Sequence, residues 1–400
     1  MRNIILVAWD GLRYDHCSIY GYERKTTPFL DLIAKQGWIF NQAISHSYWS
    51  LPSHYSVCTG KYPYEHGALM ENTKLDGTVT PLPNQPLLAE TLKGMGYSTW
   101  SYMDGSWVTD RSGLSRGFDH FYEYTLFRDP PIEGWGGRLL NKLFDTFEPQ
   151  EPFFLWVGTR DNHVPFNVPK EFEVYAKSRR LETRPDQYYT GSVIWGEEEC
   201  QEAKDRYDEG VHYQDHNLNL LWAWLEEKGY LEDTAFIFYG DHGEAMCDRW
   251  MGDRYLFEHT CVFYDELLHV PLIVWAPDLA PQQIDCQVEL KKIYNIVLDL
   301  AGHKESDPAD YHSPYAISQA SYPKIISYIW KQSNPEYDSP YIFSEKVSVR
   351  TSEWKYIHTK RWGEELYDLT ADPKERENIF NPNSPEVKVA KAQLEDITCK

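Results

Sequence analysis

The chain is short of positive charge. It has 39 lysine and arginine residues against 61 aspartate and glutamate residues, which gives a formal net charge of -22. Proteins that bind nucleic acid neutralise phosphates with lysine and arginine, so this balance argues against a nucleic-acid partner. An anionic substrate would instead have to be captured locally, by a metal ion or by histidines.

Long apolar runs and regularly spaced cysteines are also missing. No stretch reaches the roughly 18 apolar residues that a membrane-spanning helix needs. The apolar run at residues 4–8 is too short for the core of a signal peptide, and no small-residue cleavage site follows it. The seven cysteines are scattered, without a CxxC pair. These absences predict a cytoplasmic protein with reduced cysteines and no membrane span.

What the chain does have is enough apolar material for a large core, with 42% hydrophobic residues in a length of 400. Short buried runs alternate with segments of helical periodicity. This alternation predicts an α/β fold with a doubly wound, mostly parallel sheet flanked by helices. The predicted strands are residues 3–9, 38–44, 97–102, 153–157, 234–239 and 270–275, and the predicted helices are residues 29–36, 87–93, 207–228 and 288–300.

The amino-acid composition changes after Gly302. Residues 303–340 are rich in serine, proline, tyrosine and aspartate, and a series of short alternating segments follows. We therefore predict a catalytic domain at 1–302, with a polar insertion near the cleft at 177–205, and a small α+β subdomain at 303–400 packed on it. The subdomain would hold a short antiparallel sheet and a helix, with strands at 341–346, 347–351, 354–359 and 365–368 and the helix at 385–397.

A serine lies at the start of a predicted helix, in the stretch Trp49-Ser50-Leu51-Pro52-Ser53-His54. Pro52 suits the first turn of a helix, which places Ser50 just before that helix. Unpaired N–H groups and the helix dipole attract anions there. Ser50 could therefore act on an oxyanion ester, or it could simply cap the helix.

Polar residues also follow two of the predicted strands. Asp10 ends the first strand, and Asp241 and His242 follow the strand at 234–239. Ligands bind at the carboxyl ends of strands in open α/β sheets, and two carboxylates with an imidazole can hold one divalent ion. Each feature alone also fits a turn or a cap. Together with Ser50 they predict a metal-activated nucleophile.

These motifs, in this order, give the sequence a resemblance to the sulfatase family of the alkaline phosphatase superfamily over almost its whole length. The resemblance implies an alkaline-phosphatase-like fold and metal-dependent hydrolysis of sulfate or phosphate esters. It rests on the Asp10 strand, Ser50-Leu51-Pro52-Ser53, Thr59-Gly60-Lys61-Tyr62-Pro63, Asp241-His242-Gly243-Glu244, His259, Trp354-Lys355-Tyr356 and Glu365-Leu366-Tyr367-Asp368.

The resemblance also implies roles for single residues. Ser50 would be the nucleophile, and His163 and His259 would act on the substrate oxyanion. The metal ligands would be Asp10, Asp241, His242 and Ser50. We add as predicted substrate contacts His54, Lys61 and Asp161. One divalent ion is predicted, with a second ion on Asp161, His163 and His259 as the alternative.

Two positions depart from the family pattern. His54 stands where the sulfate-cleaving signature has arginine, which argues against conversion of Ser50 to formylglycine. Gly11 stands where many sulfatases carry another metal-binding aspartate, which favours Mn²⁺ or Zn²⁺ over Ca²⁺. An unmodified Ser50 would attack phosphorus and form a phosphoserine that water then cleaves.

Sulfate and phosphate esters therefore both remain open as substrates, on a saccharide or another small molecule. The alternative to a formylglycine sulfatase is a phosphomonoesterase, phosphodiesterase or phosphonate ester hydrolase that uses unmodified Ser50. Two further readings are an inactive homologue that binds anions and a phosphoglycerol or phosphoethanolamine transferase. The intact Asp10, Asp241 and His242 argue against the first, and the missing membrane span argues against the second.

Overall fold

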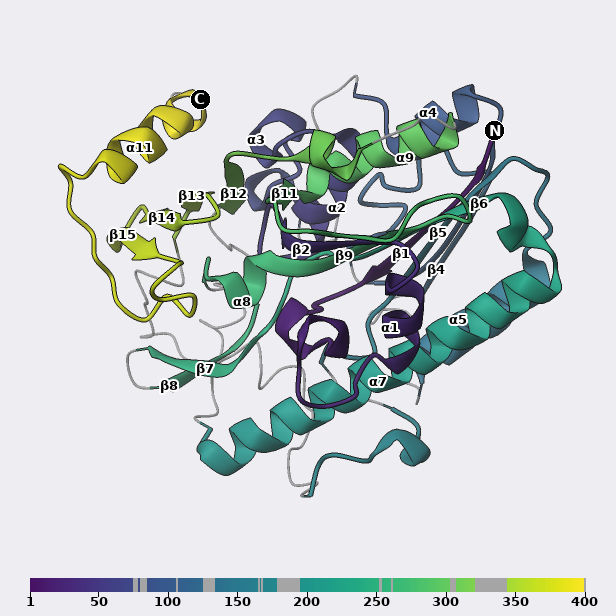
Figure 1. Ribbon diagram of the computed structural model, residues 1–400, viewed down its shortest axis with the longest axis horizontal. Helices are drawn as coiled ribbons and strands as arrows, with labels where there is room; N and C mark the ends of the chain where they lie inside the picture. The colour runs from purple at the N-terminus through teal and green to yellow at the C-terminus, as the bar shows by residue number, and fades with distance from the viewer. Residues whose placement is uncertain are drawn as a thin grey trace.

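A large sheet forms the centre of the molecule (Figure 1). The computed structural model describes residues 1–74, 78–79, 85–105, 107–124, 134–164, 166, 168–177, 195–251, 254–259, 262–302, 307–320 and 344–398. Within these residues the sheet has nine strands, in the order β10-β2-β9-β6-β1-β5-β3-β4, with β11 also paired to β2. Their bounds are β1 Asn3–Trp9, β2 Trp38–Ile44, β3 Ser98–Asp104, β4 His120–Tyr124, β5 Phe153–Thr159, β6 Thr234–Gly240, β9 His269–Trp275, β10 Gln282–Ile284 and β11 Val288–Glu289.

The sheet is mostly parallel, as predicted. Strand β1 pairs in parallel with both β5 and β6, and β3 pairs in parallel with β4 and β5. Strand β9 is the exception, because it runs antiparallel to both β2 and β6. All seven residues of β1 are buried, which is why the sequence shows a continuous apolar run there rather than an alternating one.

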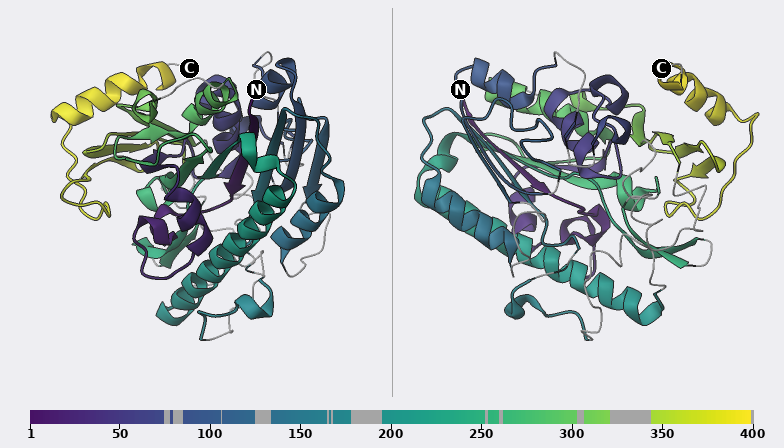
Figure 2. Two further views of the ribbon diagram at one scale, coloured as in Figure 1. Left: turned by 45° about the vertical axis from the view of Figure 1, so that its right-hand side comes forward. Right: turned by 180° about the vertical axis from the view of Figure 1, so that it is seen from behind.

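Helices cover both faces of this sheet (Figure 2). One core packs the α2, α4 and α9 side against Ile4, Leu6 and Ala8 of β1, and the other packs the α1, α5 and α7 side against Ile5, Val7 and Trp9. This alternation along β1 confirms the doubly wound architecture. The helices are α1 Pro28–Ala34, α2 Ser50–Thr59, α3 Pro63–His66, α4 Leu88–Gly94, α5 Trp135–Thr146, α7 Glu197–Glu227, α8 Asp265–Leu268, α9 Ile293–Ala301 and α11 Pro385–Thr398.

Across the residues that the structure describes, no helix combines the length and the apolar character needed to cross a membrane.

The C-terminal part forms a second, four-stranded antiparallel sheet, in the order β12-β13-β14-β15, beside α11. This confirms the small α+β subdomain, although the boundary at 302/303 stays a prediction. Strand β12 was not predicted, and the strand predicted at 341–346 falls partly outside the described residues. The strands are β12 Ala316–Ala320, β13 Lys346–Arg350, β14 Trp354–Thr359 and β15 Gly363–Asp368.

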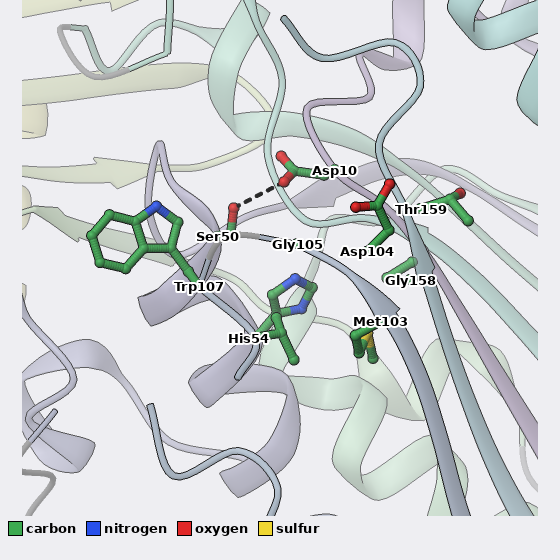
Figure 3. A pocket seen from close by; sticks show the side chains of 11 residues that line it. Asp10, Ser50, His54, Met103, Asp104, Gly105, Trp107, Gly158 and Thr159 are labelled. Carbon is green, nitrogen blue, oxygen red and sulfur yellow. Dashed lines mark hydrogen bonds between the residues drawn. The ribbon is translucent and has the colours of Figure 1, made fainter. Parts of the chain in front are cut away.

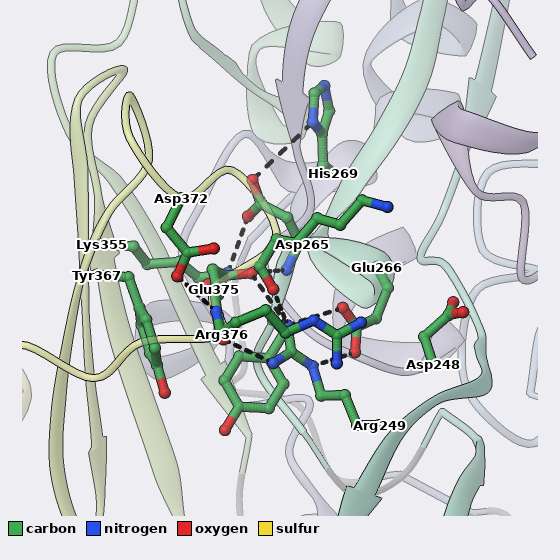
Figure 4. Close-up of polar contacts among 12 residues, drawn as sticks. Asp248, Arg249, Asp265, Glu266, His269, Lys355, Tyr367, Asp372, Glu375 and Arg376 are labelled. Carbon is green, nitrogen blue, oxygen red and sulfur yellow. Dashed lines mark hydrogen bonds and ion pairs between the residues drawn. The ribbon is translucent and has the colours of Figure 1, made fainter.

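A buried group of charges joins the two parts (Figure 4). Asp265 of α8 accepts a hydrogen bond from Lys355 Nζ of β14 at 2.8 Å and from Arg350 Nη2 of β13 at 2.9 Å. On the main-domain side, Arg249 donates to Glu266 Oε2 at 3.0 Å and to the backbone oxygen of Glu375 at 2.7 Å. These contacts fix the small sheet to α8, just before the start of β9.

Three sequence predictions need correction. Helix α7 begins at Glu197, so residues 197–205 of the predicted insertion are helical, while 178–194 lie outside the described residues. The helix predicted at 288–300 is strand β11 followed by a short turn and α9. A hairpin of β7 Ala245–Met251 and β8 Arg254–Glu258 was not predicted.

The prediction that all cysteines are reduced is also wrong. Cys200 on the first turn of α7 and Cys247 on β7 form a disulfide, with a Cα–Cα distance of 5.8 Å. Neither the early start of α7 nor strand β7 was predicted, so nothing in the sequence pointed to this pairing. The cysteines therefore give no support to the predicted cytoplasmic location.

Candidate active site

Two neighbouring strands place the two carboxylates side by side. Strand β1 pairs with β6 so that Trp9 lies opposite Gly240, and the next residue of each strand is Asp10 or Asp241. Gly11 then turns the chain with φ +70°, a conformation that favours glycine. Its backbone N–H donates to Asp241 Oδ1 at 3.1 Å, which ties the two strand ends together.

Helix α2 brings Ser50 to the same point. Ser50 is the first residue of α2 and is buried. From the sequence we expected it just before the helix, so the helix begins one residue earlier than predicted. The Oγ of Ser50 lies 3.2 Å from His242 Nε2. It also lies 3.4 Å from Asp10 Oδ2, and Figure 3 draws this second contact. The residue that precedes the helix is Trp49, and no side chain caps this end. The geometry therefore does not support a capping role for Ser50.

The surroundings of His242 favour a positive charge at this point. Its Nδ1 lies 2.8 Å from the backbone oxygen of Gly243, which can only accept, so Nδ1 carries a hydrogen. Its Nε2 faces Asp10 Oδ1 at 3.3 Å and Asp241 Oδ2 at 3.6 Å. Burial alone would lower the pKa of His242, but Asp241 and Asp10 raise it to about 10. A proton or a metal ion can supply this charge.

The donor atoms fit a divalent ion. Asp10, Asp241 and His242 each offer one ligand atom, and these atoms lie within 4.8 Å of one another. Asp10 Oδ1 and Asp241 Oδ2 are buried and form no hydrogen bond within the described part of the chain, although a histidine Nε2 lies 3.3 Å from each of them, that of His242 and that of His54. A cation would compensate both oxygens, because buried carboxylates are otherwise costly.

Next to this group lies a second one, made of His163, Glu244 and His259. The ring of His259 lies 4.5 Å from that of His242 and 4.9 Å from that of His163, measured between ring centroids. Its Nδ1 lies 3.3 Å from Glu244 Oε2. Burial lowers the pKa of His163, although Asp10 opposes this shift. The three histidines together hold the pKa of Asp10 well below its usual range, against the effect of its burial.

His54 is buried beside Asp241. Its Nδ1 is 2.9 Å from the hydroxyl of Tyr239, and its Nε2 is 3.3 Å from Asp241 Oδ2. His54 also lines the pocket that contains Asp10 and Ser50. A substrate contact at His54 stays a prediction, whereas its contact with Asp241 is part of the structure.

The structure does not bring Lys61 and Asp161 to this group. Lys61 follows Gly60, which ends α2, so the length of the helix, roughly 15 Å at the rise of an α-helix, separates it from Ser50. Asp161 accepts hydrogen bonds from the N–H of Gly136, at 3.1 and 3.2 Å, at the start of α5. Burial and the charge of Asp104 raise the pKa of Asp161 to about 7.

Several residues of the site were not predicted. Glu244 stands two positions after His242, and this spacing puts both side chains on one side of an extended segment, so the signal was present in the sequence. Asp104 ends β3 as Asp10 ends β1, but the predicted strand stopped at residue 102. The pocket in Figure 3 is lined by Ala8, Asp10, Ser50, His54, Met103, Asp104, Gly105, Trp107, Val108, Gly158 and Thr159.

The fold and these side chains define an ester hydrolase of the α/β class. The family model described as Sulfatase matches residues 2–303, and the chain belongs to the sulfatase family. A second model, described as N-sulphoglucosamine sulphohydrolase, C-terminal, matches residues 252–398.

Individual proteins are similar to this chain in sequence or in fold. The Ulvan-active sulfatase of Formosa agariphila is 23% identical, over 98% of this chain and 79% of its own length. The phosphonate monoester hydrolase of Agrobacterium radiobacter shares the fold, with a TM-score of 0.73 at 18% identity over 100% of this chain and 95% of that one. A protein solved with its substrate D-glucosamine-2-N,6-O-disulfate has a TM-score of 0.70 at 19% identity, over 100% and 97%.

Proposed function

We propose that this chain is a metal-dependent hydrolase of sulfate or phosphate esters in which residue 50 attacks the sulfur or phosphorus atom. The observation that carries the proposal is the position of Ser50 Oγ, within 3.4 Å of both Asp10 and His242. A hydroxyl beside a carboxylate and an imidazole at the start of a helix is placed for nucleophilic attack on an anionic ester.

The proposed ligands of the ion are Asp10, Asp241, His242 and Ser50. When bound, a divalent ion supplies Lewis-acid polarisation of the ester oxygen and lowers the pKa of the Ser50 hydroxyl. Two carboxylates with one imidazole favour Mn²⁺ or Zn²⁺, and Ca²⁺ is the alternative. Asp241 Oδ1 accepts from the backbone N–H groups of Gly11 and His242 at 3.1 and 2.8 Å, and these bonds hold the carboxylate in place while His54 Nε2 lies 3.3 Å from Oδ2.

His259 lies between His242 and His163, with ring centroids 4.5 and 4.9 Å away, and both His163 and His259 would face the oxygen that leaves. His163 Nδ1 donates to the backbone oxygen of Val164 at 2.7 Å, so its Nε2 carries a lone pair in the neutral ring. The lowered pKa of His163 favours this neutral form. In that state the ring binds an electrophile or accepts a proton, and it does not donate one to the leaving oxygen.

The substrate is proposed to be a saccharide or another small-molecule ester. Relatives are named as sulfatases, and one fold neighbour was solved with a disulfated glucosamine. Trp107 lines the pocket beside Ser50, where an indole can pack against a sugar ring. Hydrolysis of phosphate or phosphonate esters by unmodified Ser50 is the second candidate, favoured by His54 at the arginine position of the sulfatase signature.

The test combines mass analysis of residue 50 with turnover of paired aryl sulfates and aryl phosphates in Mn²⁺, Zn²⁺ or Ca²⁺. Ser50→Ala should lower kcat by about 10⁴-fold or more, as loss of a nucleophile does in other hydrolases. Ser56→Ala is the matched control, because Ser56 is buried on the same helix and contacts His66 instead. Full activity of Ser50→Ala would overturn the assignment. An aldehyde at residue 50 with sulfate turnover would identify a formylglycine sulfatase and overturn the second candidate.

A further inference from the structure

We propose that His163, Glu244 and His259 form a second divalent-cation site, so that this active site binds two ions side by side. The role of that site in ester cleavage rests on the proposed function, but the site itself rests on the geometry. The alternative ligand set predicted from the sequence, with Asp161, is wrong, because the carboxylate beside the two histidines is that of Glu244.

The three side chains converge from three separate loops. His163 follows β5, Glu244 precedes β7 and His259 follows β8. Each offers one ligand atom, these atoms lie within 4.8 Å of one another, and all three residues are buried. Two imidazoles and one carboxylate are a donor set that catalytic zinc sites use, with the remaining position open to water or substrate.

Glu244 points to a missing cation. Its side chain is 1% exposed, and its Oε1 accepts no hydrogen bond from the described residues. Its other oxygen, Oε2, lies 3.3 Å from His259 Nδ1. An ionised carboxylate with one unsatisfied oxygen is expensive to bury, and a cation removes that cost.

Two glycines make room for this arrangement. At Gly243, between His242 and Glu244, a Cβ atom would come within 2.0 Å of the backbone oxygen of Glu266, so only glycine allows this loop to pack so closely. At Gly11 a Cβ atom would lie 3.6 Å from Glu244 Oε2 and 3.8 Å from His163 Cδ2. A Cβ atom at position 11 would therefore touch the second group at an ordinary contact distance.

Charge also favours two ions. With neutral histidines, the carboxylates of Asp10, Asp241 and Glu244 carry three negative charges. One divalent ion leaves these six side chains at about -1, which opposes an anionic ester, whereas two ions bring them to about +1. In sites with two metal ions, about 3.5–4 Å apart, one stabilises the attacking oxygen and the other the leaving oxygen.

Metal stoichiometry tests this inference directly. Metal-depleted full-length protein is reloaded with Zn²⁺ alone or Mn²⁺ alone, freed of excess ion, and analysed by plasma mass spectrometry. We expect two ions per chain in the wild type and one in Glu244→Gln and in His259→Asn. Glu202→Gln is the matched control, because Glu202 is a buried carboxylate paired with Arg206 on α7, and it should keep two ions.

A second readout is independent of whether the variants fold. The wild type with Mn²⁺ should give the electron paramagnetic resonance signal of two coupled ions, and crystals with Zn²⁺ should give two anomalous peaks. One ion at saturation in the wild type overturns the inference, and so do two ions in both folded variants. Ester turnover with one ion would leave the proposed function intact. Two ions without any ester turnover would support the site and overturn the proposed function instead.

Discussion

Replacing His54 with phenylalanine should weaken metal binding more than it weakens the fold. The ring of His54 links Tyr239 to Asp241, with contacts of 2.9 and 3.3 Å, and it is almost fully buried. Loss of these two contacts should lower the free energy of unfolding by about 1–3 kcal/mol, because buried polar groups lose their partner. Loss of a residue that orients a ligand should lower metal affinity by roughly 10–100-fold.

The two effects are measured separately, by urea unfolding of the metal-free protein and by chelator competition for Zn²⁺ or Mn²⁺. His46→Phe is the matched control. His46 is also buried, and its ring makes two hydrogen bonds, with the backbone oxygen of Ile317 at 2.7 Å and the N–H of Lys291 at 3.2 Å. It should lose similar stability and keep its metal affinity. If His54→Phe also kept its affinity within about twofold, the ring would not orient Asp241 and the reasoning would fail.

Three further predictions concern the fold and the ion. Asp265→Asn should lower the free energy of unfolding by about 3–5 kcal/mol, because buried Lys355 then loses the negative charge of its partner. Lys360→Ala, which removes an exposed pair with Glu345, should change that free energy by less than about 1 kcal/mol. Urea unfolding of both variants compares the two effects. Burial lowers the pKa of His269 to about 4, so the unfolded chain binds a proton that the folded chain does not, and stability should fall as pH drops from about 6.5 to 4, by up to about 3 kcal/mol. Urea midpoints across this range test that, and an unchanged slope in His269→Gln would contradict it. Removal of the metal with a chelator should abolish turnover and lower the melting temperature. Metal added at about 100 times its Kd should raise the free energy of unfolding again by about 2.7 kcal/mol. Equal activity with and without metal would rule out a role for the ion.

Local patterns in the sequence predicted much of the fold and part of the site. Continuous apolar runs identified β1, β5 and β6, because strands buried on both faces need no polar residues. The residues that follow such strands gave Asp10, Asp241 and His242, and the proline of the next motif gave the helix that starts at Ser50. These features depend on neighbours in the chain, so they are readable without the fold.

Tertiary structure decided what depends on distant contacts. The antiparallel direction of β9 and the pairing of β12 with β13 follow from sheet assembly, which the local pattern does not encode. The disulfide joins residues 47 positions apart, and it required the early start of α7 and an unpredicted strand.

Contacts between residues distant in the sequence also decided which side chains form the site. Lys61 and Asp161 lie near site residues in the sequence, yet the length of α2 and the direction of the Asp161 side chain keep them away. Glu244 and His259 lie together because the β7–β8 hairpin pairs Ala245 with Glu258. His163 reaches the same point from the loop that follows β5. The sequence by itself determined which chemical groups end the strands. The packing of three loops at one edge of the sheet decided which of those groups lie close enough to interact.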